Sequence, residues 1–101
     1  MKMEEKVLNL LGLAKRAGKL TTGEELVVKS IQNGKAKLVF VANDASENLI
    51  KKIADKTDYY KIRMTDIFSS YELSNAIGEP RKVIAVTEKG FAKKMGELMS
   101  K

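Results

Sequence analysis

Two carboxylates stand next to each other in the sequence, at Glu24 and Glu25, directly after Gly23. A neighbouring pair of this kind can act as a general acid and a general base. It is also typical of the first turn of a helix, where the helix dipole stabilises negative charge. We favour the helix start, because the chain has no histidine or cysteine that would complete a catalytic or metal-binding cluster.

Other patterns that carry chemistry are also absent from the sequence. Gly18, Gly23 and Gly34 have the spacing of neither a dinucleotide-binding loop nor a phosphate-binding P-loop. No serine has a histidine partner, and no group of acidic residues has the spacing of a metal site. We therefore expect a protein that is not an enzyme, with no catalytic residue, no metal and no cofactor.

Positive charge is the more informative feature. The 101 residues carry a formal charge of +6, and residues 1–37 alone carry +4 of it. The lysines close to Gly23 in the sequence are Lys19, Lys29, Lys35 and Lys37. Arg81 and Lys82 form a second basic segment. Helix N-termini and basic side chains both attract phosphate groups, so this pattern favours a nucleic-acid partner.

Two simpler explanations of the charge stay open. Lysine-rich surfaces also keep proteins soluble without binding anything. Lys15 and Arg16 lie in the last turn of the first predicted helix and Lys19 follows it, so these residues can equally well stabilise the C-terminal end of the helix dipole.

A helix and a strand must position these residues. Thr22 and Glu25 have the spacing of a capping box, in which each side chain accepts a hydrogen bond from the other residue's amide. This spacing predicts a helix that ends at Gly34, followed by a strand over the continuously apolar residues 38–42.

Helices and strands alternate along the rest of the chain. The predicted helices span residues 4–16, 44–56, 65–78 and 88–99, and the further predicted strands span residues 19–21, 60–64 and 83–86. Asp44 and Thr65 are predicted to cap the helices that begin with them. The alternation predicts the α/β class, as a three-layer α/β/α sandwich with residues 1–101 in a single domain.

Such a fold has consequences for the candidate residues. Ligands of open α/β sheets bind where strands end and helices begin, so residues 23–25 and 42–44 are expected to share one rim. Tyr60 and Tyr71 are predicted to face the core, so we expect no aromatic platform for stacking bases.

Six segments of the chain have the residues and the order of segments in a known protein family. They are residues 18–23, 29–31, 34–46, 72–78, 81–86 and 90–93. Together they resemble the kink-turn RNA-binding ribosomal protein family, which includes the ribosomal proteins L-seven-Ae and L-thirty-e. The small bacterial YlxQ-type members are the most similar, and the resemblance covers residues 4–95. It implies a mixed sheet of four strands and a noncatalytic RNA-binding role.

The resemblance also implies which residues bind RNA. The turn that reads the sheared G·A pairs of a kink-turn falls on Thr22, Gly23, Glu24 and Glu25, with Lys29 on the RNA backbone. The end of the strand contributes Asn43 and Asp44, and the loop that packs on a flipped-out nucleotide falls on Arg81, Lys82, Val83 and Ile84. The family's strong kink-turn binders carry Asn or Lys at the position of Glu25. A carboxylate there would face the acceptors of guanine and be repelled, so this residue departs from the family pattern.

The leading hypothesis is therefore a ribosome-associated protein that recognises structured RNA such as a kink-turn or an internal loop. The alternatives are a protein–protein interaction module on the same fold, and a substrate-recognition module resembling those of RNA methyltransferases. The charge of residues 1–37 favours RNA. No apolar run approaches the ~20 residues of a membrane span, so we expect a cytoplasmic protein with no membrane partner. We also expect it to be a monomer.

Overall fold

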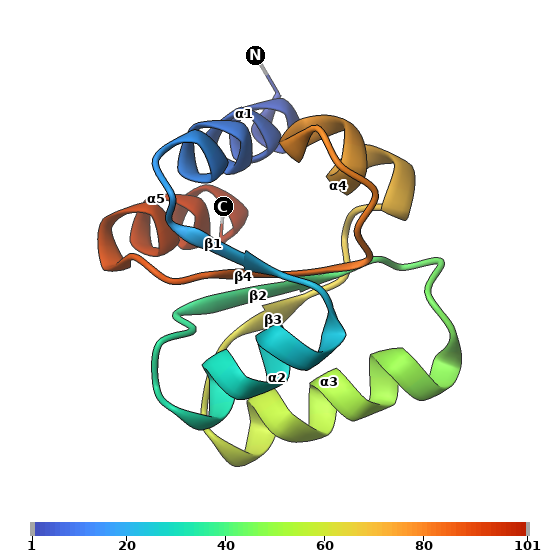
Figure 1. The fold of residues 1–101 in the computed structure, drawn as a ribbon. Coiled ribbons are helices and arrows are strands. Elements are labelled where there is room, and N and C mark those ends of the chain that lie inside the picture. The colour runs from blue at the N-terminus through green and yellow to red at the C-terminus, as the bar shows by residue number, and fades with distance from the viewer. Residues whose placement is uncertain (1, 101) are drawn as a thin grey trace.

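The computed structural model describes residues 2–100 of the chain, and within them five helices and four strands (Figure 1). In chain order these elements are α1 (Met3–Arg16), β1 (Leu20–Thr22), α2 (Glu24–Gln32), β2 (Leu38–Val41), α3 (Glu47–Tyr59), β3 (Met64–Thr65), α4 (Ser70–Ile77), β4 (Val83–Val86) and α5 (Lys89–Met99).

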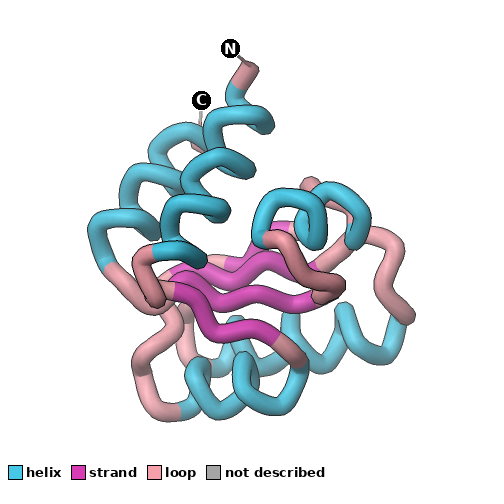
Figure 2. Tube along the Cα trace, turned by 45° about the horizontal axis from the view of Figure 1, so that its top comes forward, coloured by secondary structure: helices cyan, strands magenta, loops and turns pink. Residues whose placement is uncertain are grey.

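The four strands form one mixed sheet in the order β1-β4-β2-β3. β4 runs antiparallel to both β1 and β2, whereas β3 runs parallel to β2. Helices α1, α4 and α5 cover one face of the sheet, and α2 and α3 lie side by side on the other (Figures 1 and 2). The predicted three-layer α/β/α sandwich with a mixed four-stranded sheet is thereby confirmed.

The two central strands form the middle of the core. Every residue of β2 and of β4 is buried, as expected of strands that are covered on both faces. Val7, Leu11 and Met95 reach this core from the helices on one side, and Val27 and Ile53 from those on the other. The continuous apolar runs in the sequence therefore predicted the central strands correctly.

The predicted helix starts differ from the observed ones. α3 is capped by Ser46, whose Oγ accepts from the amide of Leu49 at 3.2 Å, and not by Asp44. α4 is capped by Ser69, which forms a capping box with Glu72, and not by Thr65. A serine closer to each helix satisfies the first-turn amides, which leaves Asp44 free to bind elsewhere.

Most of the predicted strand over residues 60–64 is the turn that follows α3, and only Met64 belongs to a strand, β3. The amides of Lys61 and Ile62 bond to the carbonyls of Asp58 and Thr57, which is the Schellman arrangement, with Lys61 at a φ of +60°. Tyr60 is consequently 40% exposed, and Tyr71 on α4 is 77% exposed, so neither faces the core as predicted.

Candidate nucleic-acid interface

Three segments far apart in the sequence meet at one end of the sheet, where β1 and β2 end and β4 begins. The amide of Gly23 donates to the carbonyl of Val83 at 3.1 Å, and the amide of Ala42 donates to the carbonyl of Lys82 at 2.8 Å. These bonds follow from the register, since β4 begins where its antiparallel neighbours β1 and β2 end. We call this end of the sheet the strand-end rim, and it comprises Thr22–Glu25, Asn43, Asp44 and Arg81–Ile84.

The start of α2 at this rim is not the predicted capping box. The N-cap is Gly23, at a φ of +91°, and no side chain among residues 2–100 caps the helix. Glycine reaches a positive φ easily, whereas residues with a side chain rarely do. The helix therefore has its N-cap at Gly23, one residue after the predicted cap Thr22. The first-turn amides of α2 therefore lack a side-chain acceptor and can bind an external one.

Thr22 is used in a different way. Its Oγ1 donates to Oε1 of Glu79 at 3.2 Å and accepts from Nε of Arg81 at 3.1 Å. Nζ of Lys15, on α1, lies 3.1 Å from the same Glu79 oxygen. Lys15 is the main cause that lowers the pKa of the Glu79 carboxyl, and Thr22 and Arg81 act in the same direction. Glu79 thus holds the rim together, a role that no sequence pattern indicated.

The loop that carries Arg81 is fixed on both sides. Oγ of Ser74, on α4, donates to the carbonyl of Arg81 at 3.1 Å and accepts from its amide at 3.0 Å. Nη1 of Arg81 donates to the carbonyl of Pro80 at 2.7 Å. Ser70, Ser74, Pro80, Arg81 and Lys82 line a hollow of about 380 Å³ beside this loop. The guanidinium is therefore held in place before any ligand arrives.

Asp44 also has a structural partner. Its carboxylate accepts from the amide and from the hydroxyl of Ser70, both at 2.8 Å, and so joins the end of β2 to the start of α4. The backbone amide of Ser70 is the main cause that lowers the pKa of Asp44, and the charge of Lys82 contributes. Asn43 is exposed, and its amide donates to the carbonyl of Phe68 at 2.9 Å.

The two glutamates at the start of α2 differ. The carboxylate of Glu24 is bound by Nζ of Lys52, on α3, at 2.7 Å. Glu25 is exposed and forms no hydrogen bond or ion pair with any residue of the described range 2–100. Leu26, which follows it, is 58% exposed, an apolar surface at this rim that the sequence analysis missed.

The remaining predicted residues do not reach the rim surface. Val83 and Ile84 are 2% and 0% exposed, so their side chains belong to the core and only the backbone of Val83 contributes to the rim. Lys29 is exposed in the last turn of α2. Lys19 lies at the opposite end of β1, where its carbonyl accepts from the amide and hydroxyl of Thr87.

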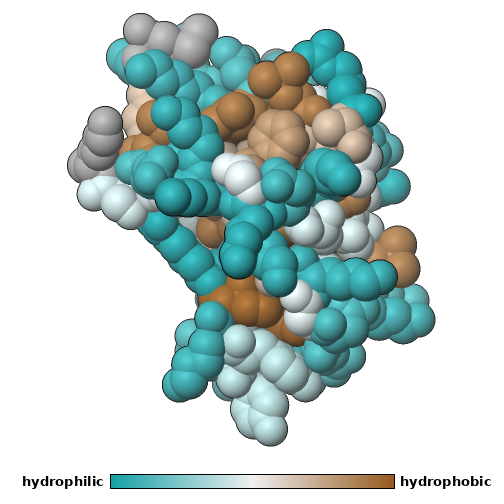
Figure 3. Space-filling view, turned by 90° about the vertical axis from the view of Figure 1, so that its left-hand side faces the viewer, coloured by the Kyte–Doolittle hydropathy of each residue, from teal (hydrophilic) through white to brown (hydrophobic). Residues whose placement is uncertain are grey.

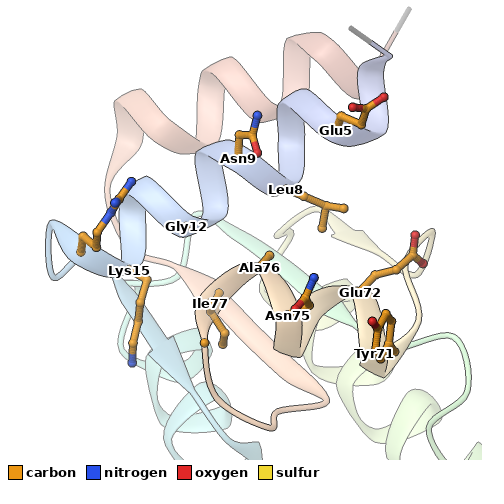
Figure 4. A pocket seen from close by; sticks show the side chains of 12 residues that line it. Glu5, Leu8, Asn9, Gly12, Lys15, Tyr71, Glu72, Asn75, Ala76 and Ile77 are labelled. Carbon is orange, nitrogen blue, oxygen red and sulfur yellow. The ribbon is translucent and has the colours of Figure 1, made fainter.

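A second feature near the rim is a hollow of about 600 Å³ between α1 and α4 (Figure 4). The two helices approach closely here, since a Cβ on Gly12 would lie 3.0 Å from the carbonyl oxygen of Ala76. Asn9 and Asn75 contribute polar side chains, and Lys15 leaves the hollow to reach Glu79.

Metal-binding clusters and membrane-spanning helices are both absent from the described residues 2–100. Residues 2–100 contain no group of three or more acidic, histidine or cysteine side chains that could hold a metal ion. No helix in the described part of the chain is long and apolar enough to cross a membrane.

The mixed four-stranded α/β/α sandwich is a fold shared with a solved RNA-binding protein. The chain belongs to the ribosomal protein L7Ae/L30e/S12e/Gadd45 family, which matches residues 5–96. The resemblance noted in the sequence is therefore confirmed.

Particular relatives are also similar over nearly the whole chain. The RNA-binding protein YlxQ of Enterococcus faecium is 56% identical over 95 residues, which are 94% of this chain and 92% of that protein. The RNA-binding protein YlxQ of Bacillus subtilis (strain 168) is 50% identical over 91 residues, 89% of this chain and 91% of that protein.

Solved structures agree with this fold. A protein of unknown function from Bacillus halodurans superposes with a TM-score of 0.91 at 43% identity, covering 95% of this chain and 98% of that one. The 15.5kD RNA binding protein of Giardia lamblia superposes with a TM-score of 0.84 at 19% identity, covering 97% and 88%, which supports the fold alone.

Proposed function

We propose that this protein binds structured RNA, such as a kink-turn or an internal loop, through the strand-end rim. The observation that carries the proposal is the uncapped start of α2 at Gly23 beside the fixed guanidinium of Arg81. The YlxQ relatives, which are named RNA-binding proteins, support the same assignment.

The chemistry of the rim suits an irregular RNA better than a plain duplex. Backbone amides at the start of α2 and the guanidinium of Arg81 are donors in fixed positions, and they meet base-edge and phosphate acceptors that a bulge or loop exposes. Leu26 offers an apolar surface against which an unstacked base packs. A-form duplexes hide their base edges in a deep, narrow groove.

The finer assignments rest on the family resemblance. Under this proposal the protein acts in the cytoplasm as a single-domain monomer, with ribosomal RNA as its target. Glu25 limits its preference for kink-turns, because an exposed carboxylate at that place faces guanine acceptors.

The test compares two RNAs of equal length, a kink-turn and a fully paired duplex, in gel-shift titrations at ~0.15 M salt. We expect the kink-turn to bind at least about 10-fold more tightly, as one or two specific contacts would give. Equal affinity for the two RNAs would contradict the proposal. RNA recovered by crosslinking from ribosome-bound and free fractions then separates a ribosomal target from other RNAs.

A further inference from the structure

Cations line the other end of the sheet, where β2 and β3 begin and β4 ends. The amide of Lys37 donates to the carbonyl of Val86, and the carbonyl of Arg63 accepts from the amide of Val39, so both residues lie where β2 and β3 begin. Lys89 and Lys93 follow on α5, one turn apart. We call this end of the sheet the basic edge, and it comprises Lys37, Lys61, Arg63, Lys89 and Lys93.

All five cations are exposed, and none forms an ion pair with any residue in the described range 2–100. Two of them bond to neutral groups of the protein. Nζ of Lys37 donates to the carbonyl of Gly34 at 2.9 Å, and Nη1 of Arg63 donates to the carbonyl of Gly96 and to Oγ of Ser100, each at 3.1 Å. The nearby carboxylate of Glu88 is occupied as the cap of α5, where it accepts from the amides of Gly90 and Phe91 at 2.8 Å each. Uncompensated positive charge of this kind attracts a polyanion.

Two exposed tyrosines continue this surface. Tyr59 is 78% exposed and Tyr60 is 40% exposed, and their rings meet edge to face at 4.9 Å between centroids. They line a hollow of about 500 Å³ together with Lys52, Asp55 and Lys56. The end of α3 turns both rings toward solvent, so the predicted burial of Tyr60, on which the expected absence of an aromatic platform partly rested, is wrong.

The tyrosine hollow and the basic edge are continuous. Tyr60 also lines a second hollow, of about 550 Å³, with Lys61, Arg63 and Lys37. Lys37 and Arg63 in turn line a third hollow, of about 650 Å³, with Lys89 and Lys93. Figure 3 views the molecule from this side, where hydrophilic side chains cover most of the surface and a hollow at mid-height has an apolar floor.

We propose that the tyrosine pair and the basic edge together form a second RNA-binding surface, which takes an unpaired strand. Bases stack on exposed aromatic rings whatever their sequence, and lysines along a groove follow the backbone phosphates. An acidic polypeptide would use the lysines but not the ring faces, so the tyrosines favour RNA. This surface goes beyond the proposed function, since the basic edge lies at the other end of the strands. The tyrosine hollow meets the rim at Lys52, which binds Glu24.

The probe is an oligouridine of about 10 nucleotides, within the usual site sizes of single-strand binders. The variants are Tyr59→Ala and the double change Lys89→Gln with Lys93→Gln. Their matched controls are Tyr71→Ala, since Tyr71 is 77% exposed but lies on α4, and Lys94→Gln, which removes a charge from α5 outside the hollow.

We expect Tyr59→Ala and the double lysine variant each to weaken oligouridine binding about 10-fold. The double variant also lowers the slope of log affinity against log salt by about 1.4, for two lost phosphate contacts. Neither variant changes binding of a blunt kink-turn RNA, and the controls change neither ligand. Melting curves establish that each variant is folded.

The proposal is overturned if the parent protein does not bind oligouridine, or if Tyr71→Ala and Lys94→Gln weaken binding as much as the test variants. It is also overturned if a polyglutamate peptide of equal charge binds the same residues and oligouridine does not, which would make this surface a protein site. Equal affinity of the parent for kink-turn and duplex would contradict the rim function alone and leave the oligouridine result standing.

Discussion

The two ends of the sheet differ in how their charges are held. The strand-end rim contains two cations (Arg81 and Lys82) and three carboxylates (Glu24, Glu25 and Asp44). Adding the groups bonded to it from outside (Lys15, Lys52 and Glu79) gives four cations and four carboxylates, and most of these groups have a partner. At the basic edge, five exposed cations have no ion-pair partner in the described range. The net positive charge of the chain therefore gathers away from the surface that the family resemblance selects.

This difference predicts two modes of RNA binding. Groups held in fixed positions by hydrogen bonds, such as the Arg81 guanidinium, can recognise shape and base edges. Exposed lysines release counterions when they meet phosphates, so their contribution falls steeply as salt rises. Net charge alone indicated a nucleic-acid partner, but it did not indicate which end of the molecule is specific.

The largest effect is expected for Arg81→Ala at the rim. The change removes the donor to Thr22 and the cation beside Glu79, so we expect kink-turn affinity to fall about 10-fold or more. Arg81→Lys is the control that keeps the charge but loses the fixed planar donor, and it should recover only a small part of the affinity. Gel-shift titration measures both. If Arg81→Ala leaves oligouridine binding unchanged, the two surfaces bind RNA separately. If it weakens oligouridine binding as much as kink-turn binding, both RNAs use one surface.

A smaller effect of opposite sign is expected for Glu25→Lys. The exposed carboxylate has no described partner, so its replacement by a donor should tighten kink-turn binding several-fold. The melting temperature should fall slightly, because a cation then stands at the positive end of the dipole of α2. Glu25→Gln, which removes only the charge, should lie between the two. Loss of RNA affinity in a folded Glu25→Lys protein would show that the carboxylate makes a favourable contact.

Acid should loosen the rim, as well as the start of α5, where the amides of Phe91 and Gly90 lower the pKa of Glu88. Ser70 lowers the pKa of Asp44, and Lys15 lowers that of Glu79, from ordinary values of 3.8 and 4.5. A carboxyl whose pKa is lower in the folded state contributes stability that is complete above the ordinary value and is lost as pH falls through the lower folded value. Thermal melts of Asp44→Asn and Glu79→Gln should therefore depend less on pH below these values than melts of the parent.

A matched control for the acid experiment is Glu97→Gln, which removes an exposed carboxylate of α5 that forms no ion pair in the described range. It should leave the acid dependence of the melting temperature unchanged. If it flattens that dependence as much as Glu79→Gln does, general charge repulsion and not the rim contacts governs acid stability.

The smallest effect concerns Lys61, the residue at a φ of +60° within the basic edge. The left-handed conformation costs a residue with a side chain about 1–2 kcal/mol. Glycine recovers this cost but loses about 0.5–1 kcal/mol of conformational entropy on folding. Lys61→Gly should thus raise the melting temperature by a few degrees while weakening oligouridine binding slightly. Lys61→Gln removes the same charge without relieving the backbone, so it should weaken binding and not raise stability.

Local sequence determined most of the helices and the two central strands, although not the strand predicted over residues 60–64 or the starts of α3 and α4. Continuous apolar residues specified β2 and β4, and left-handed glycines follow α2 and α4 at Gly34 and Gly78, as predicted. The α5 helix, which begins beside Glu88 and ends at Met99, also matches its prediction. These features depend on side-chain periodicity and backbone preference within a few residues, so the sequence alone contains them.

Only the tertiary structure decided which partner each polar side chain takes. Threonine and aspartate are residue types that often cap helices. Thr22 instead binds Glu79, 57 residues away, and Asp44 binds Ser70, 26 residues away. The antiparallel pairing of β1 with β4 likewise places Lys19 and Arg81 at opposite ends of the sheet. A short polar side chain bonds equally well to its own backbone or to a distant group, and the packing of the sheet and helices determines which of these lies within reach.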